Sequence, residues 1–480
     1  MMRKFGFLAA VFIFAIVLFC QGLAQTTFER TYGGSQTDYA VSIVEIDGGA
    51  FVVAGCTNSY GTGGDVYMIK INASGDIVWE QNHGGDTEDN GYSLVSTADG
   101  GFVIGGYTSS SGGDAYILKT NSLGEFLWDN TFGGSEYDEA DYIYLNDDGG
   151  FAMAGYTSSF GSVGNDGYII RTDSSGDSIW ADNYSYLTSE VNERFYAISE
   201  TSDGGFIAAG LYMSWPTQSY LVKLDGDGGV EWEQIYSDFN RTNHIIETAP
   251  GEYTLTGVEL DENSYVALVE LNSSGNIVNQ WRYGVEIQQY GYHVDQTDDG
   301  GYIIAGQVID GTDYDVILIK TDSAGNETWK KYYGGTFTDM AYCVKSTSDG
   351  GYIMCGYSEV TGPGTEQVYI IKTDSEGNVN GSGINDGNEN NHPDLFTLSQ
   401  NYPNPFNSET VISYSLSMSA SVKLEIFDIL GRSIETLIDA TQKSGYYDVI
   451  WKADSYSSGI YFYKISVNNK TFTKRLILLK

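Results

Sequence analysis

The segment DGGFVIGGYTSS at residues 99–110 decides the fold, because versions of it return along most of the chain. Each full copy has an aspartate, a glycine pair, a short apolar run and a further glycine. Self-similarity at a nearly fixed period indicates a repeat architecture. The glycine that ends the apolar run recurs 47 to 55 residues apart, at Gly55, Gly106, Gly155, Gly210, Gly257, Gly306 and Gly356.

Each repeat contains four short runs typical of strands. In the second repeat these are residues 91–97, 102–108, 115–120 and 126–133, rich in Val, Ile, Tyr and Phe and bounded by Gly, Asp and Ser. The DGG turn suits a tight hairpin because its glycines accept positive φ. Four-stranded units of this period are blades of a β-propeller. We therefore predict an all-β chain with a seven-bladed propeller over residues 25–380.

The first repeat is preceded by TTFERTYGG at residues 26–34, which matches only the end of a unit. Six units carry a tryptophan before such a phrase, whereas the seventh has Gly381 there. Phe28 stands at the missing position, so the first strand is expected to complete the last blade and close the ring. This closure resembles that of WD-repeat propellers. The D-x-x-G-x-x-x-W turn resembles the docking turn of quinoprotein-type propellers, which implies a tryptophan packed between blades.

The start of the chain indicates export. Arg3 and Lys4 precede an apolar run, and small residues follow it, so residues 1–24 are expected to be a signal peptide. A lipoprotein signal at Cys20 is the alternative. Residues 381–395 have almost no apolar content and are interpreted as a linker. A calcium loop from Asn378 to Glu389 is the competing interpretation, although no helices are expected around it.

Charge excludes one class of partner. Residues 25–395 hold 13 Lys and Arg against 57 Asp and Glu, whereas residues 396–480 hold 9 against 7. The acidic part would repel nucleic acid, so we expect no nucleic-acid role. The change near residue 395 also marks a domain boundary. Cys56, Cys343 and Cys355 are expected to be small buried residues, with the last two facing each other across one hairpin.

Residues 396–480 have the period-two pattern of a small β-sandwich with Trp451 in its core. Their motifs, NYPNPFN, IFDxxGR, SGxYFYK and TKRLILLK, resemble the C-terminal sorting domain of type IX secretion substrates, in the subtype related to the hook-capping immunoglobulin-like fold. Ser408 departs from the proline usual in that family. The matching positions are Asn401, Tyr402, Pro403, Asn404, Pro405, Phe406, Asn407, Gly431, Arg432, Gly459, Tyr461, Lys474 and Arg475.

The resemblance implies a route. The chain would reach the periplasm of a Gram-negative, Bacteroidetes-type bacterium, and its tail would dock on the outer-membrane translocon and sorting machinery. The tail would then be cut, and the protein would be released or attached to surface lipopolysaccharide. An immunoglobulin-like adhesion module that stays attached is the alternative.

Catalytic motifs are not found. His83, His244, His293 and His392 fall at unrelated positions, and no nucleophile elbow, H-E-x-x-H pair or phosphate loop occurs. One acidic register repeats before the inner strands. It either bonds turn backbone or forms a ring that binds a cation, weakly calcium, and its carboxylates are Asp38, Asp89, Asp138, Glu193 and Asp339. A second register at Asp65, Asp114, Asp166 and Asp315, with a basic residue five positions later, is interpreted as a solvated blade edge.

Two irregular loops are the better ligand candidates, because insertions in repeats tend to lie on a binding face. Residues 211–219 contain Tyr212 and an extra Trp215, and residues 184–194 contain Tyr186. Aromatic rings of this kind stack on sugars. We therefore expect a secreted or cell-surface binding module for a polysaccharide or protein, without catalysis and without a cofactor. A structural surface or matrix component, or an enzyme acting on polysaccharide through the first carboxylate register, are the alternatives.

Overall fold

The computed structural model describes residues 25–110, 112–161, 164–186, 191–260, 264–284, 288–310, 313–335, 337–359, 365–379, 396–398, 401, 403–416, 420–429, 431–443, 445–453, 455–467 and 470–480. The elements in these ranges are strands, and no helix there has the length and apolar character needed to cross a bilayer. The expected signal peptide (1–24), the expected linker (381–395), Tyr402 and most of the calcium-loop template lie outside them.

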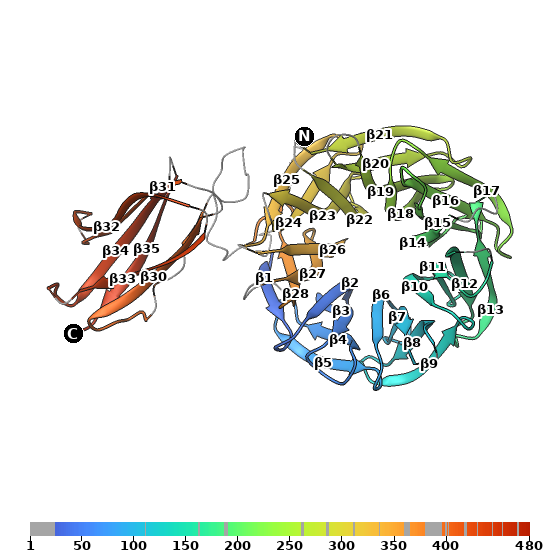
Figure 1. The fold of residues 1–480 in the computed structure, drawn as a ribbon, viewed down its shortest axis with the longest axis horizontal. Coiled ribbons are helices and arrows are strands. Elements are labelled where there is room, and N and C mark those ends of the chain that lie inside the picture. The colour runs from blue at the N-terminus through green and yellow to red at the C-terminus, as the bar shows by residue number, and fades with distance from the viewer. Residues whose placement is uncertain are drawn as a thin grey trace, which may run out of the picture.

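Seven antiparallel four-stranded sheets within the described residues stand around one axis (Figure 1), which confirms the predicted propeller. The inner strands are β2 (Asp38–Ile46), β6 (Asp89–Ser96), β10 (Asp138–Leu145), β14 (Glu193–Glu200), β18 (Arg241–Ala249), β22 (Gln289–Gln296) and β26 (Asp339–Ser346). The second strands are β3 (Ala50–Thr57), β7 (Phe102–Thr108), β11 (Phe151–Thr157), β15 (Phe206–Tyr212), β19 (Glu252–Leu260), β23 (Tyr302–Asp310) and β27 (Tyr352–Ser358).

The third and outer strands complete each blade. The third strands are β4 (Asp65–Ile71), β8 (Asp114–Thr120), β12 (Asp166–Thr172), β16 (Gln218–Leu224), β20 (Ser264–Leu271), β24 (Asp313–Thr321) and β28 (Gln367–Thr373). The outer strands are β5 (Ile77–His83), β9 (Phe126–Phe132), β13 (Ser178–Tyr184), β17 (Val230–Tyr236), β21 (Ile277–Tyr283), β25 (Glu327–Tyr333) and β1 (Phe28–Tyr32).

The ring is closed by its first strand. β1 pairs antiparallel with β28, from Phe28 opposite Lys372 to Tyr32 opposite Val368, and the last blade has the order β1-β28-β27-β26. This confirms that residues 26–34 supply the outer strand of the seventh blade. Two strands from opposite ends of the chain therefore share one sheet, and that sheet has no unpaired third strand.

Neighbouring blades dock through one repeated contact. Each repeat tryptophan lies against the glycine of the D-x-x-G turn in the next blade, as Trp128 lies against Gly176, and Phe28 does the same at Gly75. These turn glycines have φ of 74° to 86°, a conformation that favours glycine. The implied packing of tryptophan between blades is thus present at six junctions, and Phe28 completes the set at the seventh.

The repeated glycine of the second strands is required by a bulge in the inner strands. All seven inner strands shift register by one residue at the same place, for example between Gly91 and Ser93. The paired glycine, Gly106 in that blade, lies so close that a Cβ would overlap the carbonyl oxygen of Asn90. The same overlap recurs at each of the seven glycines by which the repeat was recognised.

Three of the four basic residues of the second register, Lys119, Arg171 and Lys320, are buried, so their interpretation as a solvated edge was wrong, whereas Lys70 is half-buried. Lys223 occupies the same place in its own blade. Lys223 is 1% exposed and Lys320 is 5% exposed. Each reaches the aspartate of its own blade's DGG turn, with Nζ to carboxylate distances of 3.0 Å for Lys223–Asp203 and 2.9 Å for Lys320–Asp299. The apolar stem packs inside the blade while the ammonium meets the turn. The second acidic register is also buried, with Asp65 2% exposed.

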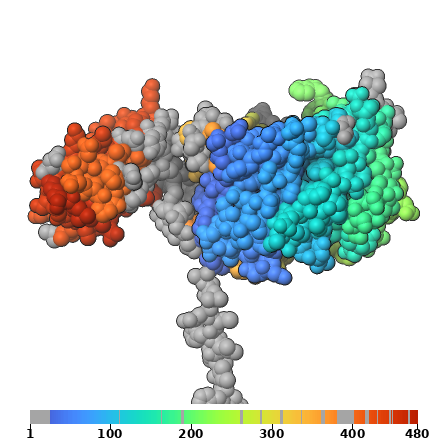
Figure 2. Space-filling view, turned by 90° about the horizontal axis from the view of Figure 1, so that it is seen from below, coloured from blue at the N-terminus to red at the C-terminus, as the bar shows by residue number. Residues whose placement is uncertain are grey.

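The two faces of the ring differ. One face carries the tight turns after the inner and third strands, which share a single hydrogen-bond pattern such as Gly100 N to Thr97 O at 2.9 Å. The opposite face, here called the loop face, carries the connections after the second and outer strands, including residues 58–64, 84–88 and 213–217. Seen from its side, the ring is a thick disc (Figure 2). The longer and more varied connections lie on the loop face, whereas the short turns on the other face have at most five residues.

The C-terminal residues form two further sheets. One contains β29 (Phe396–Leu398), β30 (Glu409–Leu416) and β33 (Gly445–Lys452), and the other contains β31 (Ala420–Phe427), β32 (Ser433–Gln442), β34 (Gly459–Val467) and β35 (Lys470–Leu478). Trp451 is fully buried between them, as expected, with the Phe406 and Tyr461 rings at 5.5 and 5.6 Å. The three cysteines of the propeller are buried with free thiols, and Cys343 faces Cys355.

Candidate functional site: the central channel

The seven inner strands line a cavity of about 630 Å³ on the propeller axis. Every inner strand contributes its bulge residue, because the extra residue of a bulge is left outside the ladder and can face the axis. A cavity of this size is typical of small-ligand sites. The bulge residues that line it are Val41, Tyr92, Asp141, Tyr196, Asn243, Tyr292 and Tyr342.

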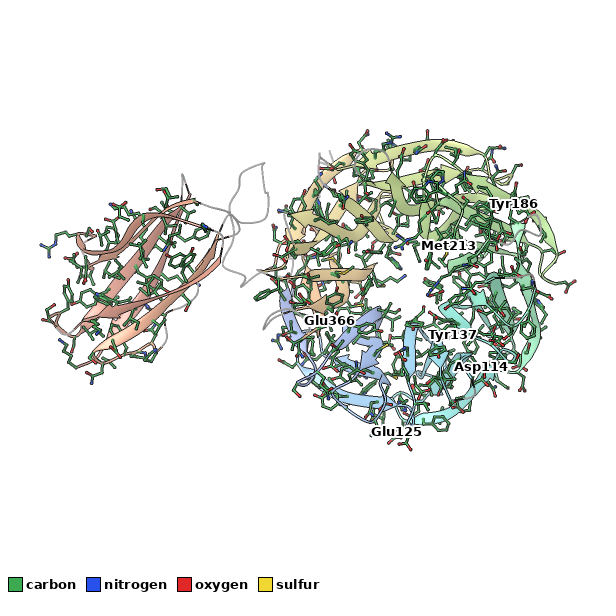
Figure 3. The ribbon with its side chains drawn as sticks, in the orientation of Figure 1. Asp114, Glu125, Tyr137, Tyr186, Met213 and Glu366 are labelled. Carbon is green, nitrogen blue, oxygen red and sulfur yellow. The ribbon has the colours of Figure 1, made fainter. Side chains whose placement is uncertain are left out.

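A belt of stacked tyrosines and arginines runs from the loop face into this cavity. Tyr137 stacks on Tyr107 at 4.5 Å and on Tyr156 at 5.7 Å. The Arg194 guanidinium lies over Tyr156 at 4.8 Å and over Tyr196 at 5.2 Å. Figure 3 places Tyr137 and Met213 near the centre of the ring, whereas Glu125 lies at its outer edge. We call this set the tyrosine–arginine belt: Tyr107, Tyr137, Tyr156, Arg194, Tyr196, Arg241, Tyr292 and Tyr342.

Two carboxylates share one arginine at the cavity wall. Arg194 donates to Glu139 at 2.8 Å and, through Nε, to Asp141 at 2.7 Å. Tyr137 also donates to Glu139, at 2.9 Å. Burial raises the pKa of Asp141, and the adjacent Arg194 only partly offsets this. The group is an ion-pair network with one carboxylate poised to accept a proton.

Arg241 differs from Arg194 because no carboxylate approaches it within the described residues. Its guanidinium lies between two belt rings, 5.1 Å from Tyr196 and 5.9 Å from Tyr292. Its Nε is buried and has no hydrogen-bond partner there. Lys345, further along the cavity wall, likewise makes no ion pair with the described residues.

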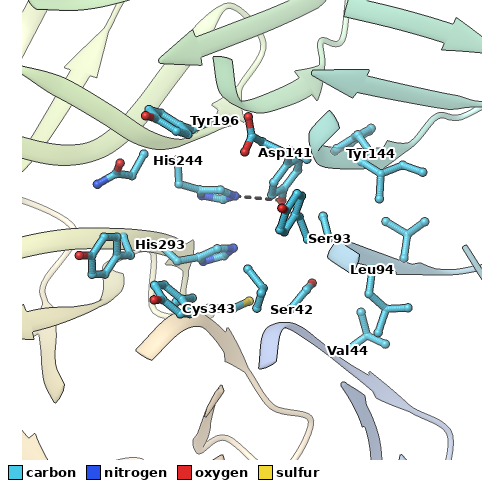
Figure 4. A pocket seen from close by; sticks show the side chains of 18 of the residues that line it. Ser42, Val44, Ser93, Leu94, Asp141, Tyr144, Tyr196, His244, His293 and Cys343 are labelled. Atoms are coloured by element: carbon cyan, nitrogen blue, oxygen red, sulfur yellow. Dashed lines mark hydrogen bonds between the residues drawn. The ribbon is translucent and has the colours of Figure 1, made fainter. Parts of the chain in front are cut away.

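A polar cluster lies deeper in the channel (Figure 4), where His244, His293 and Cys343 point into the same space. The two imidazoles stack with centroids 3.7 Å apart, and His244 Nε2 is 3.0 Å from the Tyr142 hydroxyl. Burial lowers the pKa of both histidines well below the usual range. Both rings are therefore neutral at physiological pH, and their stacking does not present two nitrogens to one metal ion.

The predicted acidic register lies at the start of the inner strands and bonds its own blade. Asp38 accepts hydrogen bonds from Gly34 N at 2.7 Å and from Thr57 Oγ1 at 2.5 Å. Gly85 N donates to Asp89 at 3.0 Å, and Gly335 N donates to Asp339 at 2.7 Å. Asp138 makes the same contacts with Gly134 and Thr157. The described residues contain no group of three or more such side chains placed to hold a metal.

Glu193, the fourth blade's member of that register, has lost these partners. It is fully buried, and the hydrogen bond that reaches its carboxylate comes from the backbone of Tyr186. Burial and the nearby Asp166 raise its pKa to about 8. A glutamate here has one methylene more than the aspartates, and the preceding loop lacks the glycine pair of the other repeats.

The predicted ligand residues lie on the loop face. Trp215 is 98% exposed in the connection between β15 and β16. Tyr212 ends β15, where it faces Glu193, and Tyr186 contacts both Tyr212 and Tyr220 at 6.0 Å. Tyr186 and Tyr212 thus form a packed pair, and Trp215 is the open member of the three.

The sorting motif at residues 401–407 is hydrogen-bonded to β35, the last strand of the C-terminal sheets. Asn401 Nδ2 donates to Thr410 at 2.9 Å, and Phe406 N donates to Ile477 O at 3.0 Å. Asn404 Oδ1 accepts from Ile477 N at 2.9 Å. Pro403, Pro405 and Asn407 are exposed beside this contact. The basic pair Lys474 and Arg475 is carried by the strand so held, β35, and Arg475 is exposed.

The other motif residues occupy turns and a strand start. Gly431 has φ of 75° in the turn where Arg432 Nε donates to Asp428 at 2.7 Å. Gly459 begins β34, and the Tyr461 hydroxyl donates to Ser457 O at 2.8 Å.

Sequence reasoning did not identify the channel residues, because only the bulge brings them to the axis. An alternating strand would place Tyr92 and Ser93 on opposite sides, yet both line the cavity. The available signal was a tyrosine three residues after the acidic register in four repeats, at Tyr92, Tyr196, Tyr292 and Tyr342.

Residues 400–479 match the family described as Secretion system C-terminal sorting domain. A tail of this kind directs secretion to the cell surface or the extracellular space in Bacteroidetes through the type IX secretion machinery. No curated protein is similar in sequence to the chain.

Among solved structures, PorZ of Porphyromonas gingivalis, a surface component of the type-IX secretion system, is 14% identical with a TM-score of 0.44. The alignment covers 94% of this chain and 60% of PorZ. The WD40 domain of Toxoplasma gondii coronin is 9% identical with a TM-score of 0.45, over 75% of this chain and 90% of that domain. A puromycin hydrolase is 12% identical with a TM-score of 0.48, over 80% and 59%.

Proposed function

We propose that this protein is a secreted or cell-surface binding module whose loop face and channel mouth take a polysaccharide. The observation that carries the proposal is the channel cavity of about 630 Å³ flanked by the tyrosine–arginine belt. Tyrosine rings offer apolar faces and hydroxyl groups together, which suits the alternating surfaces of sugars. The opposite face holds only short turns of at most five residues. A protein ligand is the second candidate. It would be supported if a protein partner bound this chain while a glycan screen gave no hit.

Trp215 gives the proposal a second contact point. An exposed tryptophan on the loop face would stack on a sugar of a chain that also reaches the belt. Binding requires no cofactor in this proposal, because the Asp38 register already bonds its own blade. Calcium and chelator should therefore leave affinity unchanged. The route in this proposal runs by a cleaved signal peptide through the periplasm, followed by removal of the tail and release or attachment to lipopolysaccharide.

A glycan-array screen of the purified protein tests this function. We expect Trp215→Ala and Tyr196→Leu each to weaken binding about tenfold, since a stacked ring contributes on the order of 1 kcal/mol or more. Leu127→Ala is the matched control, because Leu127 is half exposed on the outer strand β9. A blank array, or equal losses in all three variants, would contradict the proposal, and a blank array with high surface abundance would favour a structural surface component.

Hydrolysis of a polysaccharide is kept as a second activity on one observation. Glu139 and Asp141 lie together on the cavity wall, and the pKa of Asp141 is raised, as general acids require. If the site is catalytic, Asp141→Asn should abolish release of reducing ends while leaving glycan binding intact. No reducing ends from any bound glycan would exclude this activity.

A further inference from the structure

Arg241 is held in a fixed plane at the cavity wall. It begins β18, and belt rings lie on its guanidinium at 5.1 Å (Tyr196) and 5.9 Å (Tyr292). Stacking of this kind covers the faces of the planar group and leaves its N–H edges as donors. The side chain is neither fully buried nor fully exposed, and it lines the cavity. A preorganised donor edge therefore faces the ligand space.

Arg241 hydrogen-bonds the Tyr292 side chain but has no acidic partner within the described residues, which is notable in so acidic a domain. Residues 25–395 carry 57 Asp and Glu against 13 Lys and Arg, yet no carboxylate within the described residues pairs with Arg241. By contrast, Arg194 takes two carboxylates and Arg282 takes Glu259. The buried Nε also has no acceptor there. An unsatisfied donor of a charged group is costly unless a ligand supplies the acceptor.

We infer that Arg241 is an anion subsite for the carboxylate of an acidic sugar. A carboxylate matches the guanidinium edge with two parallel hydrogen bonds, and the flanking tyrosines match the sugar ring. The net charge of −44 over residues 25–395 would repel a long polyanion. The ligand is therefore a largely neutral glycan with one terminal uronic acid. This inference rests on the proposed glycan-binding function.

Matched glycan pairs test the subsite. Oligosaccharides ending in glucuronic acid are compared with the same chains after carboxyl reduction, using the purified full protein. We expect the acid to bind at least tenfold more tightly, and Arg241→Gln to remove about ten- to a hundredfold of affinity for the acid only. Arg241→Lys should recover part of the lost affinity, because lysine keeps the positive charge but cannot donate two parallel hydrogen bonds from one planar group. Arg282→Gln, which removes one cation from the same blade, should change nothing.

A second measurement separates the subsite from the wider function. The chain from residue 25 has seven arginines, so selective ¹⁵N-arginine labelling gives seven Nε–H signals. The signal that disappears in Arg241→Lys is assigned to Arg241. Titration with sodium glucuronate should shift this signal until it saturates. If no glycan binds yet this signal shifts, the glycan-binding function fails while the carboxylate subsite at Arg241 stands. If acid and reduced glycans bind equally, or glucuronate shifts no signal, the subsite itself is refuted.

Discussion

At the residue scale, the repeat glycines are explained by contact rather than by turn geometry. Gly106 lies in the middle of a strand, where glycine is normally unfavourable. Its lack of a Cβ lets β7 approach the bulge carbonyl of Asn90. Sequence comparison within the chain showed that this glycine recurs, but only the bulge shows why another residue does not fit.

The first prediction compares two glycines of the same blade. Gly106→Ala should lower stability by about 2 to 4 kcal/mol, because the added methyl group overlaps a backbone carbonyl that cannot move freely. Gly85→Ala meets no atom within 4 Å and should be nearly neutral. Thermal unfolding of both variants measures the difference. Equal melting temperatures would contradict the steric account.

The second prediction concerns Glu193. Its folded-state pKa of about 8 lies above the ordinary value of 4.5, so the unfolded chain binds fewer protons than the native protein between these pH values. Stability from this group is present below about pH 4.5 and is lost as the pH rises through 8. Glu193→Gln should therefore gain roughly 2 to 3 kcal/mol at pH 8.5 and little at pH 4.5.

Unfolding of the wild type and this variant across pH 4.5 to 8.5 checks the second prediction. The exposed Glu136→Gln serves as control and should be neutral throughout. A gain of the same size at both pH values would mean that packing, not ionisation, decides the effect.

At the element scale, the strands were accessible from the sequence because each run is rich in Val, Ile, Tyr and Phe and is bounded by turns with their own residue signature. The position of Phe28 in an outer strand followed from counting against the tryptophans, and the structure confirms it. The bulges were not anticipated, because the runs were identified by composition and bounding turns, which do not show the place of one extra residue in a strand. The channel residues were therefore missed while the blades were found.

The third prediction removes that closing strand. Deletion of residues 25–33 exposes the edge of β28 and the core around Ile370, which β1 now covers. We expect lower cooperativity of unfolding and concentration-dependent association, because an open sheet edge pairs with other chains. Light scattering and calorimetry measure both. A peptide of residues 25–34 added in excess should restore the monomer, and a monomeric deletion variant with unchanged unfolding would contradict the closure role.

At the scale of the whole molecule, the sorting motif and the candidate binding surface lie in different parts of the chain. The motif at residues 401–407 was recognisable by its letters, and the structure shows that it fastens β35 to the start of the domain. The ligand could not be read from the sequence, because a binding surface assembled from seven strands has no contiguous motif. Only the net charge and the aromatic content of the sequence limited the class of ligand.

The fourth prediction follows from the sorting family. A chain truncated after residue 395 should accumulate inside the cell envelope instead of reaching the surface or medium, because it lacks the domain matched at 400–479. Fractionation with immunoblotting measures this. Thr410→Val, which removes the Asn401 hydrogen bond, should reduce secretion partially. Normal secretion of the truncated chain would exclude a sorting role for the tail.

The pairing of β1 with β28 also has a consequence in time. A protein synthesised from its N-terminus presents residues 28–32 early, but their partner, residues 367–373, comes more than three hundred positions later. Residues 28–32 therefore have no partner strand until almost the whole propeller has been synthesised. Closure of the ring requires residues 367–373, and a chain interrupted before residue 367 leaves β1 without its partner strand.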